Sequence, residues 1–136
     1  MASTRIASVT ARQIYSDRGH PGVRATVTTE SGATASAEVT AGTSVGKYEV
    51  QFAYDDEDQR FGGRGVGRAV HNIEQVIAPA IVGMDATAQA EVDRTMIELD
   101  GSPDKTRLGG NAIAAVSAAL LQAAAKSVGL PLYRYI

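Results

Sequence analysis

The chain has 136 residues, which is enough for one domain with a buried core and too few for a typical barrel enzyme. Its 13 basic and 15 acidic residues are intermixed and leave a formal net charge of −2, so no broad basic surface indicates nucleic acid or an anionic membrane as a partner. It has no cysteine, which excludes disulfides, thiol catalysis and cysteine-based metal sites. Because residues 1–11 lack the apolar run of a secretory signal, we expect a single soluble, cytoplasmic domain over residues 1–136.

The first part of the chain predicts three short strands. Apolar residues among serines and threonines favour a strand over residues 5–15, and a cluster of turn formers follows at residues 16–22. Apolar and polar residues then alternate over residues 23–28, a tight turn lies at residues 30–32, and another strand spans residues 33–40. We therefore expect an antiparallel meander with one wet face, whose other face is covered by helices from later in the chain.

Two helices are predicted in the middle of the chain. Apolar residues recur at helical spacing over residues 66–77, and Pro79 is expected to end or kink that helix. A second helix is expected to begin near Asp85 or Thr87 and to end at Gly101.

The most apolar stretch runs from Gly110 to Gly129 and predicts a buried helix. Asn111 is expected to cap its start, Gly129 to end it in a left-handed conformation, and Pro131 to prevent its continuation. The helix has apolar residues, mostly alanines, on nearly all of its faces, so neighbouring elements must enclose it. A membrane span is disfavoured because polar residues interrupt the stretch. These residues are Asn111, Ser117, Gln122 and Lys126.

The loop at residues 40–49 is a candidate binding segment. Gly42 and Gly46 bracket its centre and would let the backbone approach a ligand. The loop matches neither a Walker motif nor a dinucleotide fingerprint. From the residues alone, an ordinary strand-to-helix connection and a ligand-binding loop both remain open.

Three further polar features are weaker candidates. The acidic run at residues 55–58 could bind a hard cation, although a solvated turn explains it more simply. Arg64 and Arg68 follow a glycine-rich stretch and could meet an anion, or they could simply be solvated. His71 is placed beside Asn72 on the polar side of a helix without a second histidine at metal-ligand spacing, so we interpret it as a surface residue.

Five stretches together resemble the N-terminal domain of enolase, and they extend over nearly the whole chain. Residues 16–22 read SDRGHPG where the family has DSRGNPT, and residues 40–50 read TAGTSVGKYEV where it has PSGASTGxxEA. Residues 63–66 read GRGV, similar to GKGV. The most specific match is LDGSPDKTRLGGNAI at residues 99–113 against LDGTxNKxxLGANAI. The ending PLYRYI at residues 131–136 resembles the junction between the family's first domain and its barrel.

This resemblance implies an α+β domain, in which a three-stranded antiparallel β-meander is followed by a bundle of about four helices. In the family, the domain caps a barrel that converts 2-phosphoglycerate to phosphoenolpyruvate and water with Mg²⁺. The resemblance also implies that the loop is a lid over the substrate and that Ser44 is a ligand of the second Mg²⁺. The implied lid residues are Gly42, Thr43, Ser44, Val45 and Gly46. No complete catalytic set is recognisable in the chain, and the catalytic barrel domain is absent from it.

The chain departs from the family at several positions of the loop and just after it. Thr40, Ala41 and Val45 replace proline, serine and threonine, and Tyr54 stands at the arginine of the family's ELRD stretch. A lid with fewer hydroxyls should hold phosphate or metal less well.

Three functions follow as hypotheses. The first is the capping domain of an enolase-type lyase that is inactive alone, needs a barrel domain or subunit and uses Mg²⁺ only with that partner. The second is a stand-alone protein-binding or regulatory module that kept the fold. The third is the small subunit of a split lyase acting on another enolisable phosphorylated or phosphonate acid. In each, an apolar surface is expected to drive partner binding or self-association.

Overall fold

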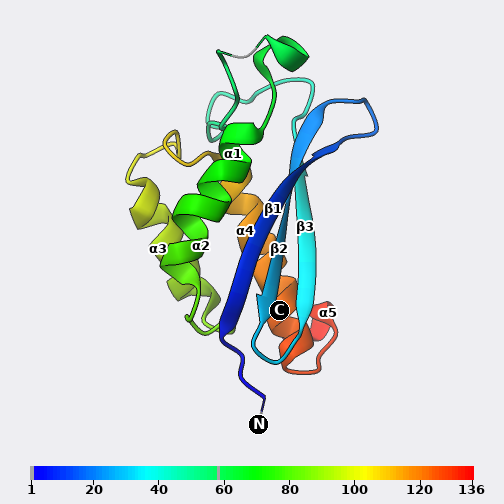
Figure 1. The fold of residues 1–136 in the computed structure, drawn as a ribbon, viewed down its shortest axis with the longest axis vertical. Coiled ribbons are helices and arrows are strands. Elements are labelled where there is room, and N and C mark those ends of the chain that lie inside the picture. The colour runs from blue at the N-terminus through cyan, green and yellow to red at the C-terminus, as the bar shows by residue number, and fades with distance from the viewer. Residues whose placement is uncertain (1, 58) are drawn as a thin grey trace.

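A three-stranded antiparallel sheet in the order β1-β2-β3 forms one layer of the molecule (Figure 1). The computed structural model describes residues 2–57 and 59–136, and Met1 and Asp58, the last residue of the acidic run, lie outside the described residues. The strands are β1 (Ile6–Tyr15), β2 (Pro21–Thr29) and β3 (Thr34–Thr40). Val27 of the central strand lies opposite Val9 on one side and Ala35 on the other, as expected for a meander.

The two faces of the sheet differ as the alternating pattern predicts. On one face Val23, Ala25 and Val27 are fully buried. On the other face hydroxyl groups pair across the strands, Thr26 with Ser36 at 2.7 Å and Thr28 with Thr34 at 3.0 Å. An ion pair between Arg24 and Glu38 continues this polar ladder. The prediction of one wet and one covered face is therefore confirmed.

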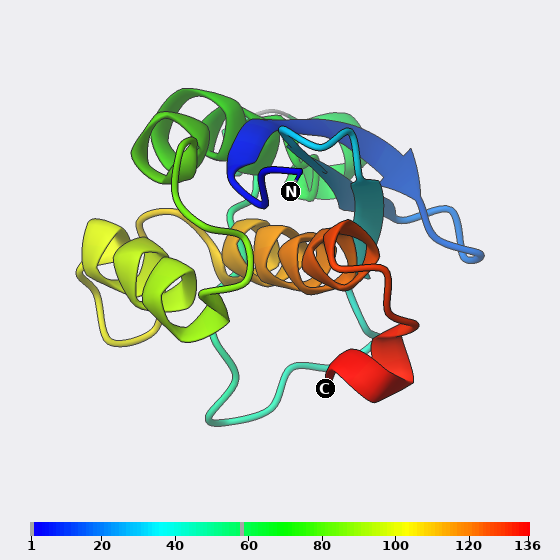
Figure 2. The same cartoon turned by 90° about the horizontal axis from the view of Figure 1, so that it is seen from below.

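Helices cover the apolar face of the sheet (Figure 2). In the part of the chain that the structure describes, one helical run made of α1, η2 and α2 is joined by α3, α4 and α5, which confirms the predicted α+β class with about four helices. The bounds are α1 (Gly67–Asn72), η2 (Ile73–Ile77), α2 (Ala78–Ile81), α3 (Gln89–Asp100), α4 (Gly110–Ser127) and α5 (Leu132–Tyr135), with a short 3₁₀ turn, η1 (Arg60–Gly63), before α1. None of the described helices combines the length and apolarity needed to cross a membrane.

Helix α4 is the buried core helix that the sequence predicts. It packs against β2 and β3, and Val116, Ala119, Leu120 and Ala123 are fully buried. Its end is also as predicted, because Gly129 has a φ of +74°. The amide of the next residue donates a hydrogen bond back to Ala125 O at 3.0 Å, which satisfies an otherwise free carbonyl.

The start of α4 corrects the prediction that Asn111 is its N-cap. Gly109 occupies the cap position without a side-chain cap, and Asn111 lies inside the helix with its side chain buried. The local pattern predicted a cap because asparagine favours that position, but this side-chain amide instead bonds to the backbone of Ala53, in the loop after β3. That contact belongs to the candidate site described below.

Two predictions about the helical run before α3 also need correction. Pro79 was expected to end or kink the helix. It does not end it, because the run continues to Ile81, but a π-helical turn, η2, precedes it. A π turn widens the hydrogen-bonding pattern, which accommodates the missing N–H of proline. Asn72 is buried and not on the polar side, since its amide donates to Leu108 O at 3.0 Å, whereas His71 is exposed as predicted.

Helix α3 begins later than predicted. Asp85 accepts hydrogen bonds from the Thr87 amide at 2.9 Å and from the Thr4 hydroxyl at 2.8 Å, and so it forms a turn before the helix instead of its first residues. The predicted end is confirmed, because Gly101 has a φ of +71°.

The last residue of α3 fixes the loop that leads to α4. The carboxylate of Asp100 is fully buried and accepts hydrogen bonds from the amides of Ser102 at 2.9 Å and Leu108 at 2.7 Å. Burial alone would raise the pKa of Asp100, but the hydrogen bonds from Ser102 and Leu108 outweigh it, so the pKa lies below its usual value.

We expect this carboxylate to make stability depend on pH. Because the folded-state pKa is depressed, the contribution of Asp100 is present above the unfolded-state pKa of about 3.9 and is lost as the pH falls through the folded-state pKa. Asp100→Asn should lower the free energy of unfolding by about 2 kcal/mol at neutral pH. Urea unfolding at several pH values should show this difference shrinking below about pH 4. The exposed Asp17→Asn is the control, and a difference for Asp100→Asn that is constant with pH would contradict the assignment.

Candidate functional site

The loop after β3 lies at the end of the molecule away from the N-terminus (Figure 1). All five residues from Gly42 to Gly46 are exposed, and Val45 has 70% of its surface accessible. Within the loop, the Gly46 amide donates to the Glu49 carboxylate at 2.8 Å. The predicted lid residues are thus together on one exposed loop.

The base of this loop, formed by Gln51 and Ala53, is held by hydrogen bonds to the turn before α4 and to the first residues of α4. The Gln51 amide donates to Asp104 O at 2.9 Å, and the Gly110 amide donates to Gln51 O at 2.6 Å. Asn111 then pairs with the backbone of Ala53, accepting from its N–H at 2.9 Å and donating to its C=O at 3.2 Å. A buried side-chain amide that satisfies both backbone polar groups of one residue holds that residue in a single orientation.

Two glycines allow this close approach. A Cβ built on Gly109 would lie 2.5 Å from Ala53 Cβ and 2.7 Å from Ala53 N, and Gly109 also has a φ of +99°. A Cβ built on Gly110 would overlap Val50. The adjacent glycines in the LGGNA stretch indicate a close backbone contact, but the sequence around them does not show that residues 50–53 make it.

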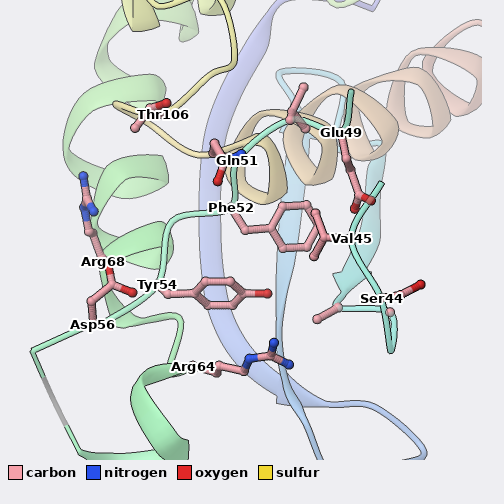
Figure 3. Close-up of a pocket in the computed structure, with 13 residues that line it drawn as sticks. Ser44, Val45, Glu49, Gln51, Phe52, Tyr54, Asp56, Arg64, Arg68 and Thr106 are labelled. Carbon is pink, nitrogen blue, oxygen red and sulfur yellow. The ribbon is translucent and has the colours of Figure 1, made fainter. Parts of the chain in front are cut away.

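A pocket of about 250 Å³ opens beneath the loop (Figure 3). Its wall combines loop residues with the segment that follows, the start of α1 and the turn before α4. Ser44, Val45, Phe52, Tyr54, Arg64 and Arg68 are among the lining residues. Gly42 lines the pocket as well, whereas the predicted lid residues Thr43 and Gly46 do not.

Charged side chains lie on two sides of the pocket. Arg64 points toward the hydroxyl end of Tyr54, and Asp56 lies with Arg68 on the other side of the pocket (Figure 3). Burial raises the pKa of Tyr54, the charge of Arg64 lowers it and that of Glu49 raises it, with a net increase. The phenol therefore stays protonated at neutral pH and can donate a hydrogen bond.

The acidic run does not behave as one cluster. The carboxylate of Asp55 points inward and accepts the amides of Gly67 at 2.8 Å and Arg68 at 2.7 Å, which satisfies the start of α1. Asp56 and Glu57 are exposed. Over residues 2–57 and 59–136, no group of three or more His, Cys, Asp or Glu side chains is arranged to hold a metal ion.

Ser44 is the residue that the resemblance assigns to Mg²⁺. Its side chain is exposed on the loop, and a hydroxyl oxygen suits a hard cation. Mg²⁺ prefers six oxygen ligands, so a single serine fits as one ligand of a site whose other ligands lie elsewhere. The described residues are therefore compatible with sharing an ion and do not hold one by themselves.

Together, these features define a small α+β domain that presents an exposed loop on a fixed base above a pocket lined by both charged and apolar side chains. Residues 6–136 match the family model described as the N-terminal domain of enolase. A curated enolase from Methanopyrus kandleri is 54% identical over 132 residues, which cover 97% of this chain and 31% of that protein. The chain belongs to the enolase family and corresponds to its N-terminal domain. It spans about a third of the length of this curated relative.

Proposed function

We propose that the chain is the capping domain of an enolase-type lyase, which converts 2-phosphoglycerate to phosphoenolpyruvate and water when a barrel domain or subunit completes the site. The observation that carries this proposal is the loop of residues 41–50, whose base is pinned by Gly110 and Asn111 while its centre is exposed over a pocket. A lid needs this combination, because its hinges must be positioned and its tip must be free to close. The resemblance would place the reaction in glycolysis and in the cytoplasm.

The glycines of the loop support a second, closed conformation. A Cβ built on Gly42 would lie 3.6 Å from the nearest atom outside the adjacent residues, and one built on Gly46 would lie 3.7 Å from its own nearest such atom, both ordinary van der Waals distances. Neither glycine has a positive φ. The observed conformation therefore does not require glycine at these positions, and their freedom is available for movement of the loop.

Ser44 would be the contribution of the lid to metal binding. In such a lyase, bound Mg²⁺ stabilises negative charge on the substrate carboxylate. Ser44 would present its hydroxyl at the exposed centre of the loop, so that closure brings the oxygen toward the substrate. Val45, the next residue, has a methyl group where the family has a hydroxyl, so it can donate no hydrogen bond from that position.

The chain is proposed to be inactive alone because removing a proton from carbon needs a positioned base. The titratable side chains that line the pocket beneath the loop are Glu49, Tyr54, Asp56, Arg64 and Arg68. Glu49 already accepts the Gly46 amide, Asp56 is exposed to solvent, and the raised pKa of Tyr54 keeps its phenol protonated at neutral pH. The base is therefore expected from the partner.

Reconstitution tests this function. The chain alone should form no phosphoenolpyruvate from 2-phosphoglycerate and Mg²⁺, and a mixture with the barrel part of the Methanopyrus kandleri enolase should form it. Ultraviolet absorbance of the product measures turnover, and size-exclusion chromatography measures complex formation. Unfolded chain added to the same barrel is the control. Turnover by the chain alone would contradict the proposal, as would an inactive complex.

A second candidate, a protein-binding module, is favoured by the C-terminal segment. Leu132, Tyr133 and Ile136 are exposed, with 79% of Tyr133 and 83% of Ile136 accessible. Apolar groups gathered at one place indicate a docking surface. A complex with the barrel that forms without turnover would favour this candidate, and self-association of the chain would indicate that the same surface pairs with itself.

A further inference from the structure

Arg64 of the pocket forms no ion pair with any acidic residue that the structure describes. Arg64 follows η1 and is exposed, and the ion pair that the described residues form is the distant one between Arg24 and Glu38. Arg68 lies on the other side of the pocket, where the carboxylate of Asp56 also lines the wall (Figure 3). An unpaired guanidinium at a pocket wall can accept an anion without first breaking an internal ion pair.

A hydroxyl donor lies beside this cation. Tyr54 is half-buried, with its hydroxyl end on the same side of the pocket as the Arg64 guanidinium and facing the loop that carries Ser44 (Figure 3). At this separation the charge of Arg64 lowers the pKa of Tyr54, although burial raises it by more. The nearby carboxylate of Glu49 is occupied by the Gly46 amide.

We propose that Arg64 and Tyr54 form an oxyanion subsite beneath the loop, which binds a phosphate or carboxylate group. The planar guanidinium offers paired N–H donors with the spacing of two oxyanion oxygens, and the phenol adds a third donor from the pocket wall. Closure of the loop would add the Ser44 hydroxyl. The chain alone should bind such an anion, and only the identification of that anion with a group of the substrate rests on the proposed function.

The departures from the family pattern fit this assignment. Tyr54 stands where the family has an arginine, and Arg64 stands where it has a lysine. The wall has thus lost a charge at Tyr54, and at Arg64 a planar guanidinium, which can donate two hydrogen bonds to one oxyanion, replaces a compact ammonium. The cationic centre of this wall is therefore at Arg64.

Inorganic phosphate is the probe that tests the subsite. The chain, with its tyrosine rings labelled for NMR, is titrated with phosphate at constant ionic strength, and the Tyr54 signals should shift and saturate. Arg64→Gln should weaken binding about tenfold, and Tyr54→Phe should weaken it while keeping the ring. Arg94→Gln, which removes an exposed arginine of α3, is the matched control and should leave binding unchanged. A parallel titration with acetate shows whether a carboxylate binds as well as a phosphate.

A second readout does not depend on affinity. Because Arg64 lowers the pKa of Tyr54, Arg64→Gln should raise the pKa of that phenol further, and Arg94→Gln should not. A Tyr54 signal that does not saturate with phosphate or acetate would overturn the subsite, as would equal weakening by Arg64→Gln and Arg94→Gln. Either result leaves the reconstitution test of the lyase function unaffected, so the two proposals fail separately.

Discussion

Gly109→Ala is expected to lower the free energy of unfolding by about 4 kcal/mol. The new methyl group would lie 2.5 Å from Ala53 Cβ and 2.7 Å from Ala53 N, and the backbone at Gly109 has a φ of +99° that alanine adopts only with strain. The obstructing atoms include backbone that Asn111 holds in place, so the loop base cannot move aside without breaking that pairing. Urea unfolding measures the loss.

The matched control is Gly32→Ala in the turn between β2 and β3. Gly32 has a φ of +88°, but no atom lies within 4 Å of a Cβ built there. This variant therefore carries the backbone strain without the steric overlap and should lose about 1 kcal/mol. Equal losses for the two variants would show that the α4 start and the loop base do not contact each other as described.

Ser44→Ala is expected to reduce turnover of the assembled lyase about 100-fold. The proposed role of the hydroxyl is to ligate Mg²⁺ when the loop closes, and no other side chain of the loop centre that lines the pocket has an oxygen. Because Ser44 is exposed, the free energy of unfolding should stay within about 0.5 kcal/mol of the parent chain. Steady-state kinetics at several Mg²⁺ concentrations measures the effect.

Thr43→Ala provides the comparison within the same loop. Thr43 is exposed and also has a hydroxyl, but it does not line the pocket. Turnover with Thr43→Ala should stay within about twofold of the parent, because this variant removes a hydroxyl one position away from the proposed ligand. If Ser44→Ala retained full turnover, or if both variants lost it equally, Ser44 would not be the metal ligand of the lid.

Much of the fold could be predicted because its determinants are local. Alternation over β2 and apolar residues all round α4 follow directly from burial on one face of a sheet and on nearly all sides of a helix. The end of α4 at Gly129 was equally predictable, since a left-handed residue there needs no information from the rest of the chain.

The errors concern residues whose partners are distant. Asn111 was expected to cap its own helix, yet its partner Ala53 is 58 positions away. Asn72 was expected in water, but it donates to the carbonyl of Leu108, 36 positions away. An asparagine side chain has the same local preferences in either case, so only the packed structure decides which backbone group it meets.

The candidate site divides in the same way. The loop centre could be proposed as a binding segment because its two glycines stand close together in the sequence, and the resemblance to the family singled out Ser44. The inward turn of Asp55 onto the amides of Gly67 and Arg68 was missed, because four successive acidic residues resemble a solvated run. That Arg64 and Tyr54 line the same pocket was also missed, since it depends on how two separate segments meet there.

The base of the loop is held by residues that come much later in the chain, so it can fold only after they have been synthesised. The partners of Gln51 and Ala53 are Asp104, Gly110 and Asn111, so a ribosome must release the start of α4 before the base can be fixed. Until then the sheet can pair locally, while the segment after β3 has no docking place. Protection of the Ala53 amide during synthesis would therefore mark the moment at which the helical layer joins the sheet.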